Sequence, residues 1–430
     1  MRILLTGASG FIGQHLLQAL LTEGHHVVCA VRTPEARLPH SHDPRLSYIH
    51  ADFSKDTDKS VWLARLSHVD AVINTVGIFR ESGRQNFVRL HRDAPRALFA
   101  ACAESHDVQV VIQLSALGAD REAQTPYHLS KRDADDYLAA LPLRSYIVQP
   151  LLVYGRDGAS ARIFRSLASM PLTVRLGSKP QLVQPIHIDD LVQAMVGLLK
   201  HRLPMMPGSG TSMRVPLVGP EAMPFTDYLG LLRSSMGMGR QRVLTLPGPL
   251  ARMAAAILPG SLISRDALSM LDRDNSADVM QTAMLLGHLP RSPHEFIGDP
   301  DGKRARAKLD WLLPMHRYSI AAVWILTAIV SFGLYPVEAS YELLARTGVP
   351  PELQPLMLYG AATVDLLLGL GILVLARRRW LWLVQLGLIG FYTIVIAFKL
   401  PEFLLHPYGP LTKNLPMLAA IWLLYQLEEK

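Results

Sequence analysis

Three polar residues, Ser115, Tyr127 and Lys131, have the types and spacing needed for proton transfer. A phenol titrates near pH ~10, which is too high for it to act as a base unaided. Tyr127 and Lys131 are four residues apart, so on a helix they share one face. An ammonium group there stabilises the phenolate and lowers the phenol pKa. Because Ser115 directly follows the strand-like run Val110–Leu114, the three residues form a candidate catalytic group.

A glycine-rich turn lies between the first strand-like run, Arg2–Thr6, and an amphipathic helix that extends to about Leu21. The first glycine permits a tight turn, the second lets the backbone approach a pyrophosphate, and the third allows the helix to pack closely on the strand. Phosphates then lie at the helix N-terminus, where free N–H groups and the helix dipole favour anions. The turn therefore predicts dinucleotide binding through Gly7, Ser9, Gly10, Phe11, Ile12 and Gly13.

The residue after the second strand-like run, Val27–Val31, bears on the choice of cofactor. An NAD site usually has Asp or Glu there to bind the ribose hydroxyls, whereas this chain has Arg32. Because a guanidinium suits a phosphate, Arg32 favours NADP, with NADPH preferred and NAD as the alternative. A solvated surface arginine is the other interpretation of Arg32.

These motifs follow one another in the order found in a known enzyme family. The run Thr-Gly-Ala-Ser-Gly-Phe-Ile-Gly at residues 6–13, followed by Ser115 and by Tyr-His-Leu-Ser-Lys at 127–131, resembles the extended and atypical short-chain dehydrogenase/reductases of the epimerase/dehydratase type. The resemblance covers roughly residues 1–300. It implies that the tyrosine acts as acid and base, that the serine holds the substrate oxygen, and that the lysine also binds the nicotinamide ribose. It further implies cofactor contacts from Asp52, Asn74 and Gly77.

Two further residues are candidates for a substrate cleft. The run Val148–Gly155 resembles the family's Arg-Pro-x-x-Val-Tyr-Gly segment, but Gln149 stands in place of the arginine, so a difference in substrate handling is expected. His187 matches a His-Val-Asp-Asp segment that lines the family's cleft, and a structural hydrogen bond explains it equally well. The stretch Leu244–Gly298 is similar to the branch that includes the nucleotide-binding accessory subunit of respiratory complex I.

The last third of the chain has the composition of a membrane domain. Half of the 430 residues are hydrophobic, and the excess is concentrated after Tyr318. A spanning helix needs ~20 mainly apolar residues. A buried soluble helix explains any single apolar stretch, but not four in succession. The layout, with the run His406–Asn414, resembles the DoxX-like membrane family. The four predicted spans are Tyr318–Tyr335, Leu356–Leu375, Leu381–Leu400 and Leu411–Leu427.

The net charge of +7 is better explained by membrane lipid than by nucleic acid. Basic residues cluster in Lys303–Arg317, just before the first span, and in Arg377–Arg379, between the second and third. Anionic lipid attracts such clusters, and the positive-inside rule places them in the cytoplasm. We therefore expect a multi-pass protein of the inner (cytoplasmic) membrane with both termini cytoplasmic. The two cysteines lack metal-ligand spacing, so no metal site is expected.

An acidic residue, Asp365, lies near the middle of the second span. A charge at that depth is costly, so Asp365 should face the bundle and have a partner. The candidates on the third span are Gln385, Tyr392 and Thr393. An interhelical hydrogen bond and a quinone or proton site are the alternatives.

The sequence thus predicts an α/β Rossmann-type doubly wound parallel sheet with a small substrate-side lobe, joined to an all-α bundle of four transmembrane helices. The expected parts are 1–300, with 150–300 forming the lobe, a basic linker 301–317, and a membrane domain 318–430. The predicted function is NADP(H)-dependent hydride transfer to or from a carbonyl or alcohol carbon of a lipophilic, quinone- or isoprenoid-like substrate. The alternatives are a non-catalytic NADPH-binding accessory, assembly or redox-sensing protein of a membrane complex, and a bundle that is itself the functional part.

Overall fold

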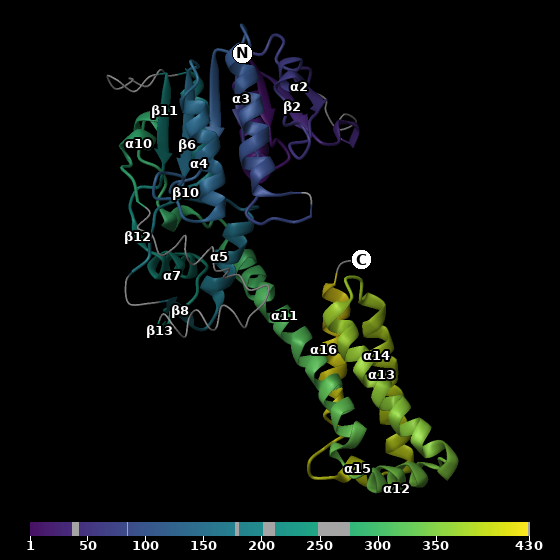
Figure 1. Cartoon of the computed structure of the whole chain (residues 1–430). Helices are drawn as coiled ribbons and strands as arrows, with labels where there is room; N and C mark the ends of the chain where they lie inside the picture. Colours follow the sequence, from purple (N-terminus) through teal and green to yellow (C-terminus); the bar gives the residue numbers. More distant parts are fainter. Residues whose placement is uncertain (37–42, 84, 177–179, 201–210, 248–275, 429–430) are drawn as a thin grey trace. The chain divides into compact units, whose positions relative to one another are not determined.

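The computed structural model describes residues 1–36, 43–83, 85–176, 180–200, 211–247 and 276–428. The chain divides into two compact units, Met1–Ala307 and Lys308–Lys430. The first is a sheet covered by helices, and the second is helical (Figure 1).

A parallel sheet forms the centre of the first unit. Its seven strands are β1 (Arg2–Thr6), β2 (His26–Val31), β3 (Leu46–His50), β4 (Ala71–Asn74), β5 (Val110–Leu114), β6 (Ser145–Pro150) and β11 (Ser212–Leu217). They lie in the order β11-β6-β5-β4-β1-β2-β3 with all neighbours parallel. The order reverses between β1 and β4, and such sheets bind ligands at the carboxyl ends of the strands beside that reversal. The α/β prediction is confirmed.

Helices cover both faces of the sheet, because its strands are nearly continuous apolar runs that leave no polar face for water. Successive strand residues point to opposite faces, so Leu5 packs in one apolar cluster and Leu4 in the other. The free cysteines Cys29 and Cys102 are buried in these two clusters. The helices over Leu5 are α1 (Phe11–Thr22), α6 (Ile188–Lys200) and α10 (Met280–Leu286), and those over Leu4 are α2 (Lys59–Leu63), α3 (Ala94–Glu104) and α4 (Pro126–Ala139).

A smaller lobe is built from segments that follow β6. It has its own core, in which Tyr154, Tyr228, Leu232 and Phe296 are buried together. Three short strand pairs support it, two parallel and one antiparallel. Its elements are β7 (Leu152–Tyr154), α5 (Ala159–Ser169), β8 (Thr173–Leu176), β9 (Leu182–Val183), β10 (Pro185–His187), β12 (Met223–Pro224), α7 (Phe225–Ser235) and β13 (Val243–Leu246).

The second unit is a bundle of apolar helices. Its helices are α11 (Pro300–Ile329), which begins in the first unit, α12 (Val337–Thr347), α13 (Gln354–Val374), α14 (Arg379–Lys399), α15 (Glu402–Leu405) and α16 (Asn414–Leu427). In the described residues three segments are long and apolar enough to cross a membrane, Pro300–Leu334, Pro351–Val374 and Arg379–Lys399. The residues 301–317, expected as a linker, are the first part of α11.

The fourth predicted span is shorter than expected. Helix α16 has 14 residues, so it extends about 21 Å, whereas the hydrocarbon layer is ~30 Å thick. It is apolar and packs along α14, with Ile421 and Leu424 in the bundle core. Each of the four predicted spans corresponds to an apolar helix, α11, α13, α14 or α16, but α16 is too short for a full-length span.

The interior of the bundle contains polar residues from four helices, α11, α13, α14 and α16. Trp324 donates a hydrogen bond to Gln385 (Nε1–Oε1 2.8 Å), and Asn414 donates one to Thr393 (Nδ2–Oγ1 2.8 Å). Thr393 and the side-chain oxygen of Gln385 are therefore bonded elsewhere, whereas Gln385 Nε2 has no hydrogen bond among the described residues. Asp365 is buried, and its Oδ1 has no hydrogen bond within the part of the chain that the structure describes. The expected interhelical hydrogen bond is thus not formed by this oxygen.

Charged residues join three segments at one end of the bundle. The carboxylate of Glu428 accepts from Arg378 Nε (2.9 Å) and Trp382 Nε1 (2.6 Å), and it lies 3.1 Å from a guanidinium nitrogen of Arg317. These cations belong to α11 and to the α13–α14 connection. The residues after α16 therefore return to the end of the bundle at which the basic residues of these two segments lie.

Candidate functional site

The glycine turn has the geometry that its sequence predicts. After β1, Gly7 has a φ of +76°, a conformation that side chains rarely allow. The amide of Gly10 donates to the Gly7 carbonyl (2.9 Å), and α1 begins at the next residue with no side-chain cap on its first N–H groups. A Cβ at Gly13 would lie 2.1 Å from the Gly7 oxygen, so only glycine lets α1 pack this closely on the turn.

A cavity of about 530 Å³ opens beside this turn, at the carboxyl ends of β1, β2 and β4. It lies where the strand order reverses, as the fold predicts for a ligand. Of the residues predicted to bind cofactor, six line it: Gly7, Ser9, Gly10, Arg32, Asp52 and Gly77. Its size, its glycine wall and the uncapped N-terminus of α1 fit a dinucleotide, with the phosphates at the turn.

Charged side chains gather at the β2 end of the cavity. Lys55 Nζ lies 3.8 Å from the carboxylate of Asp52, and Arg32 is exposed on the same wall. Burial raises the pKa of Asp52, but the hydrogen bonds from Ser54 and the charges of Lys55 and Arg32 outweigh it, so the pKa is lowered overall. Lys55 was missed in the sequence because it belongs to no motif. The two cations give this end of the cavity a preference for an anionic group.

Several residues predicted to bind cofactor have packing roles instead. Asn74 is fully buried between strands, where its side chain accepts from Thr6 Oγ1 (2.6 Å) and donates to Gln113 (2.7 Å). The ring of Phe11 lies against Gly155 and Gly158 of the lobe. Asn74, Phe11, Ile12, Gly13 and Lys131 do not line the cavity.

Ser115 and Lys131 meet at the carboxyl end of β5. Lys131 Nζ donates to the carbonyl of Leu114 (2.9 Å), the residue before Ser115. The Ser115 hydroxyl donates to Asp135 Oδ2 from the next turn of α4. Burial lowers the pKa of Lys131 to about 8, against the opposing charge of Asp135. The structure thus brings together two of the three predicted catalytic residues through α4 and the end of β5.

The third residue, Tyr127, lies near the start of α4 among aromatic rings. Its ring stacks on Phe79 (centroids 5.3 Å apart) and meets His91 edge-on (5.5 Å). Lys131 Nζ is 5.8 Å from the Tyr127 ring centroid, over the ring. Burial, together with the charge of Asp135, raises the pKa of Tyr127. The expected lowering by Lys131 is therefore wrong: the phenol stays protonated near neutral pH.

His91 connects the catalytic group to the cavity and was not predicted. Its Nε2 accepts from the amide of Ile78 (2.9 Å), and its Nδ1 lies 3.1 Å from Ser130 Oγ. Burial and the charge of Lys131 lower the pKa of His91 to about 2, so the ring is neutral. A Cβ at Gly77 would lie 3.6 Å from both His91 Nε2 and Lys131 Nζ. The cavity and the Ser115–Tyr127–Lys131 group therefore share a wall at Gly77.

The two candidate substrate residues lie on the lobe side. Gln149 is buried in β6. His187 ends β10, and its Nδ1 lies 3.1 Å from Arg291 NH1 and accepts from the amide of Asp189 (3.3 Å). Burial lowers the pKa of His187. His187 thus has the structural hydrogen bonds that one of the two interpretations required.

Two parts of the chain match known protein families. Residues 3–206 match the NAD dependent epimerase/dehydratase family, and residues 321–422 match the DoxX-like family. The chain joins an epimerase/dehydratase-family domain to a DoxX-like domain. The predicted resemblance to both families is confirmed.

Two curated relatives resemble the part of the chain that contains the epimerase/dehydratase domain. A ceramide reductase of Caulobacter vibrioides is 26% identical over 68% of this chain and 86% of its own length. The NADH dehydrogenase [ubiquinone] 1 alpha subcomplex subunit 9 of Arabidopsis thaliana mitochondria is 24% identical over 68% of this chain and 75% of its own. The second agrees with the expected complex I branch.

Solved structures share the fold of the epimerase/dehydratase domain. A nucleoside-diphosphate-sugar epimerase from Staphylococcus aureus has a TM-score of 0.53 at 16% identity, covering 70% of this chain and all of that one. The UDP-glucuronic acid 4-epimerase from Bacillus cereus, in complex with UDP-glucuronic acid and NAD, has a TM-score of 0.51 at 20% identity and covers 72% of this chain and 100% of that one. These likenesses establish the fold.

The close packing at Gly13 gives a direct test of the turn. In Gly13→Ala the methyl group must displace the Gly7 carbonyl, so the domain should lose about 1–3 kcal/mol of unfolding free energy. Thermal unfolding of the full chain should shift down by several degrees. Gly239→Ala is the control, because nothing lies within 4 Å of a Cβ there. Equal melting of the two variants would contradict the packing described.

Proposed function

We propose that this protein is a membrane-anchored, NADP(H)-dependent oxidoreductase that transfers hydride between the nicotinamide and a carbonyl or alcohol carbon of a lipophilic substrate. The observation that carries the proposal is the shared wall at Gly77, where the dinucleotide-sized cavity meets Lys131. A cofactor held by the glycine turn would lie beside the group, Ser115, Tyr127 and Lys131, that was predicted to be catalytic.

The buried phenol of Tyr127 defines the expected direction of the reaction. A bound reduced nicotinamide supplies hydride to the carbonyl carbon. Because burial keeps Tyr127 protonated, its phenol gives a proton to the carbonyl oxygen as the alcohol forms, and solvent restores that proton. Lys131 lies over this ring, with its Nζ 5.8 Å from the ring centroid. The chemistry of these residues therefore favours reduction.

The preference for NADP rests on the cations at the β2 end of the cavity. Arg32 and Lys55 both line it, and no acid follows β2 to repel a phosphate on the ribose. Asp52 lies beside them, but its carboxylate is bonded to Ser54 and paired with Lys55. The cation pair therefore suits the additional phosphate of NADP.

The DoxX-like domain supports a substrate that is dissolved in lipid. The three apolar segments that are long enough to span a bilayer anchor the enzyme to the membrane. A relative named for ceramide reduction supports a lipid carbonyl more than a quinone or an isoprenoid. The basic residues in α11 and before α14 support an orientation in which these ends of the bundle, and the epimerase/dehydratase domain, are on the cytoplasmic side of an inner membrane. Glu428, which follows the last helix, contacts Arg378 and Arg317. The chain after α16 therefore lies at the same end of the bundle as these basic residues, which supports an even number of membrane crossings.

A non-catalytic accessory role in a membrane complex is the second candidate. Two observations favour it: the Ser115 hydroxyl is bonded to Asp135 rather than free, and a relative carries the name of a complex I subunit. In that role NADPH is a structural ligand or redox sensor, and a membrane complex is the partner. Unchanged cellular function in a chain without the Tyr127 hydroxyl would favour this candidate.

Removing the Tyr127 hydroxyl tests the catalytic proposal. The full chain is assayed in lipid nanodiscs with NADPH and three carbonyl probes, namely 3-oxoceramide, a long-chain methyl ketone and a short-tailed ubiquinone. Tyr127→Phe should lower kcat/KM by about 100-fold or more, since general acids contribute that much, and leave NADPH affinity within about twofold. Tyr137→Phe, on the same helix, is the control. Turnover that survives in Tyr127→Phe would contradict the assigned role.

Reversing the charge at Arg32 tests the choice of cofactor. Arg32→Asp should weaken NADPH binding by about tenfold or more, since charge-assisted hydrogen bonds contribute ~1.5–3 kcal/mol, and change NADH binding much less. Fluorescence titration of the full chain with each nucleotide gives the ratio. Arg240→Asp, at an exposed residue outside the cavity, controls for net charge. An NADPH:NADH affinity ratio that stays the same in Arg32→Asp rules out Arg32 as the phosphate ligand.

A further inference from the structure

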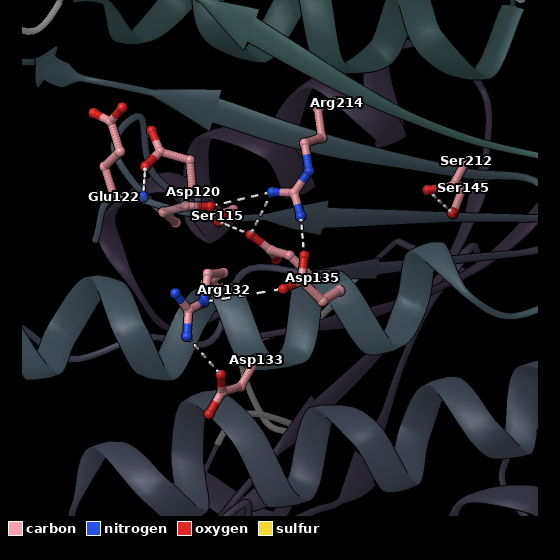
Figure 2. A network of polar contacts seen from close by, with 11 residues as sticks. Ser115, Asp120, Glu122, Arg132, Asp133, Asp135, Ser145, Ser212 and Arg214 are labelled. Carbon is pink, nitrogen blue, oxygen red and sulfur yellow. Dashed lines mark hydrogen bonds and ion pairs between the residues drawn. The ribbon is translucent and has the colours of Figure 1, made fainter. Parts of the chain in front are cut away.

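A fully buried carboxyl group, that of Asp135, lies behind the Ser115 hydroxyl (Figure 2). Asp135 is on α4, four residues after Lys131, so Tyr127, Lys131 and Asp135 follow one face of the helix. Its Oδ2 accepts the hydrogen bond from Ser115. Its Oδ1 is buried with no hydrogen-bond partner among the described residues. An ionised carboxylate here thus has one unsatisfied oxygen, which favours the neutral acid.

Charged groups on two elements oppose that effect. Arg214, from the edge strand β11, has a guanidinium nitrogen 3.7 Å from Asp135 Oδ2, and its other nitrogen contacts Asp136 at 2.5 Å. Figure 2 shows the Arg214 side chain reaching the carboxylate of Asp135, which is joined directly to Ser115. Lys131 also acts on Asp135 through its positive charge, whereas Asp136 acts through its negative charge. Burial raises the pKa of Asp135 to about 7, while Ser115, Lys131 and Arg214 lower it. Both protonation states are therefore within reach near neutral pH.

We propose that Asp135 is a positioning residue that sets the direction of the Ser115 hydroxyl, and thereby which oxidation state of the substrate the site accepts. The inference rests on the proposed function, because it concerns the serine that would hold the substrate oxygen. The spacing of Asp135 from Lys131 is visible in the sequence, but its role depends on the contacts of α4 with the end of β5 and with β11.

The two protonation states present different hydrogen-bonding partners to a substrate. When Asp135 is ionised, Ser115 donates its only hydrogen to the carboxylate, and its oxygen can only accept. An alcohol, which has a hydrogen to donate, fits this state. When Asp135 is neutral, its own hydroxyl donates to Ser115 Oγ, and the Ser115 hydrogen is free for a carbonyl oxygen. A carbonyl has no hydrogen to donate, so it fits only this second state.

The sign of the pH dependence follows from these states. Below neutrality Asp135 is mostly protonated, so carbonyl reduction is favoured, and above neutrality it is mostly ionised, so alcohol oxidation is favoured. The groups that face Asp135 are Lys131, Asp136 and Tyr127 on α4, Arg214 on β11 and Ser115 after β5. In reduction the hydride goes to carbon and the Tyr127 proton goes to oxygen, while Asp135 retains its proton throughout.

Asp135→Asn separates the two states, because an amide donates to Ser115 as the neutral acid does but cannot ionise. In nanodiscs with NADPH and 3-oxoceramide, its kcat/KM for reduction should lose the decline that the wild type shows as pH rises through neutrality. Oxidation of ceramide with NADP⁺ should fall by about tenfold or more, the effect of one hydrogen bond. Asp133→Asn makes the same charge change on the same helix, at a side chain that is 41% exposed and pairs with Arg132, and should keep both profiles.

Infrared difference spectra of the full chain give a readout that needs no substrate. The wild type should show the C=O band of a protonated carboxyl group that disappears as pH rises through neutrality. The band should be absent in Asp135→Asn, shifted in Ser115→Ala and kept in Asp133→Asn. The absence of a titrating band in the wild type, or wild-type pH profiles in Asp135→Asn, overturns the proposal. A band that titrates in the wild type and shifts in Ser115→Ala supports the coupling of Asp135 to Ser115. If that band is present but none of the carbonyl probes is reduced, the proposed function fails and the coupling stands.

Discussion

The carbonyl oxygen of Gly7 lies so close to the start of α1 that no side chain fits at Gly13, and this contact determines where the site can be. It holds the helix N-terminus beside the end of β1, where the strand order of the sheet reverses. The cavity, its cations and the shared wall at Gly77 are all arranged around that turn. A helix displaced by even one methyl group would separate the uncapped N–H groups from the phosphates they are expected to bind.

Burial controls the chemistry of the residues around this cavity. Lys131 and Asp135 have their pKa values moved toward neutrality because each is desolvated, and Tyr127 stays protonated for the same reason. Buried charges persist only with partners, so the Leu114 carbonyl, the Ser115 hydroxyl and Arg214 are as necessary as the three predicted residues. The group is therefore one connected network in which a proton on one member alters the others.

Much of the fold was predictable because it depends on the pattern of residues that are close in the sequence. The glycine spacing, the apolar strand runs and the helix carrying Tyr127 and Lys131 each follow from neighbouring residues, and the apolar C-terminal third indicated its helices. The roles of Asn74 and Asp135 did not follow, because they depend on contacts between β4 and β5 and between α4 and β11. The pKa direction of Tyr127 was also mispredicted, since spacing gave the position of the ammonium but not the extent of burial. The length of α16 depended on where the chain turns after α14.

The central claim is that the cavity beside the glycine turn binds a nicotinamide dinucleotide. Native mass spectrometry of the full chain, purified in mild detergent and incubated with NADPH, tests it most directly. We expect a species heavier by one NADPH. In Gly10→Val this species should be lost, because the added side chain extends into the cavity and meets the Gly7 carbonyl, which would lie 3.2 Å from its Cβ. A wild-type chain that takes up neither NADPH nor NADH, or a Gly10→Val chain that binds as well as the wild type, would contradict it.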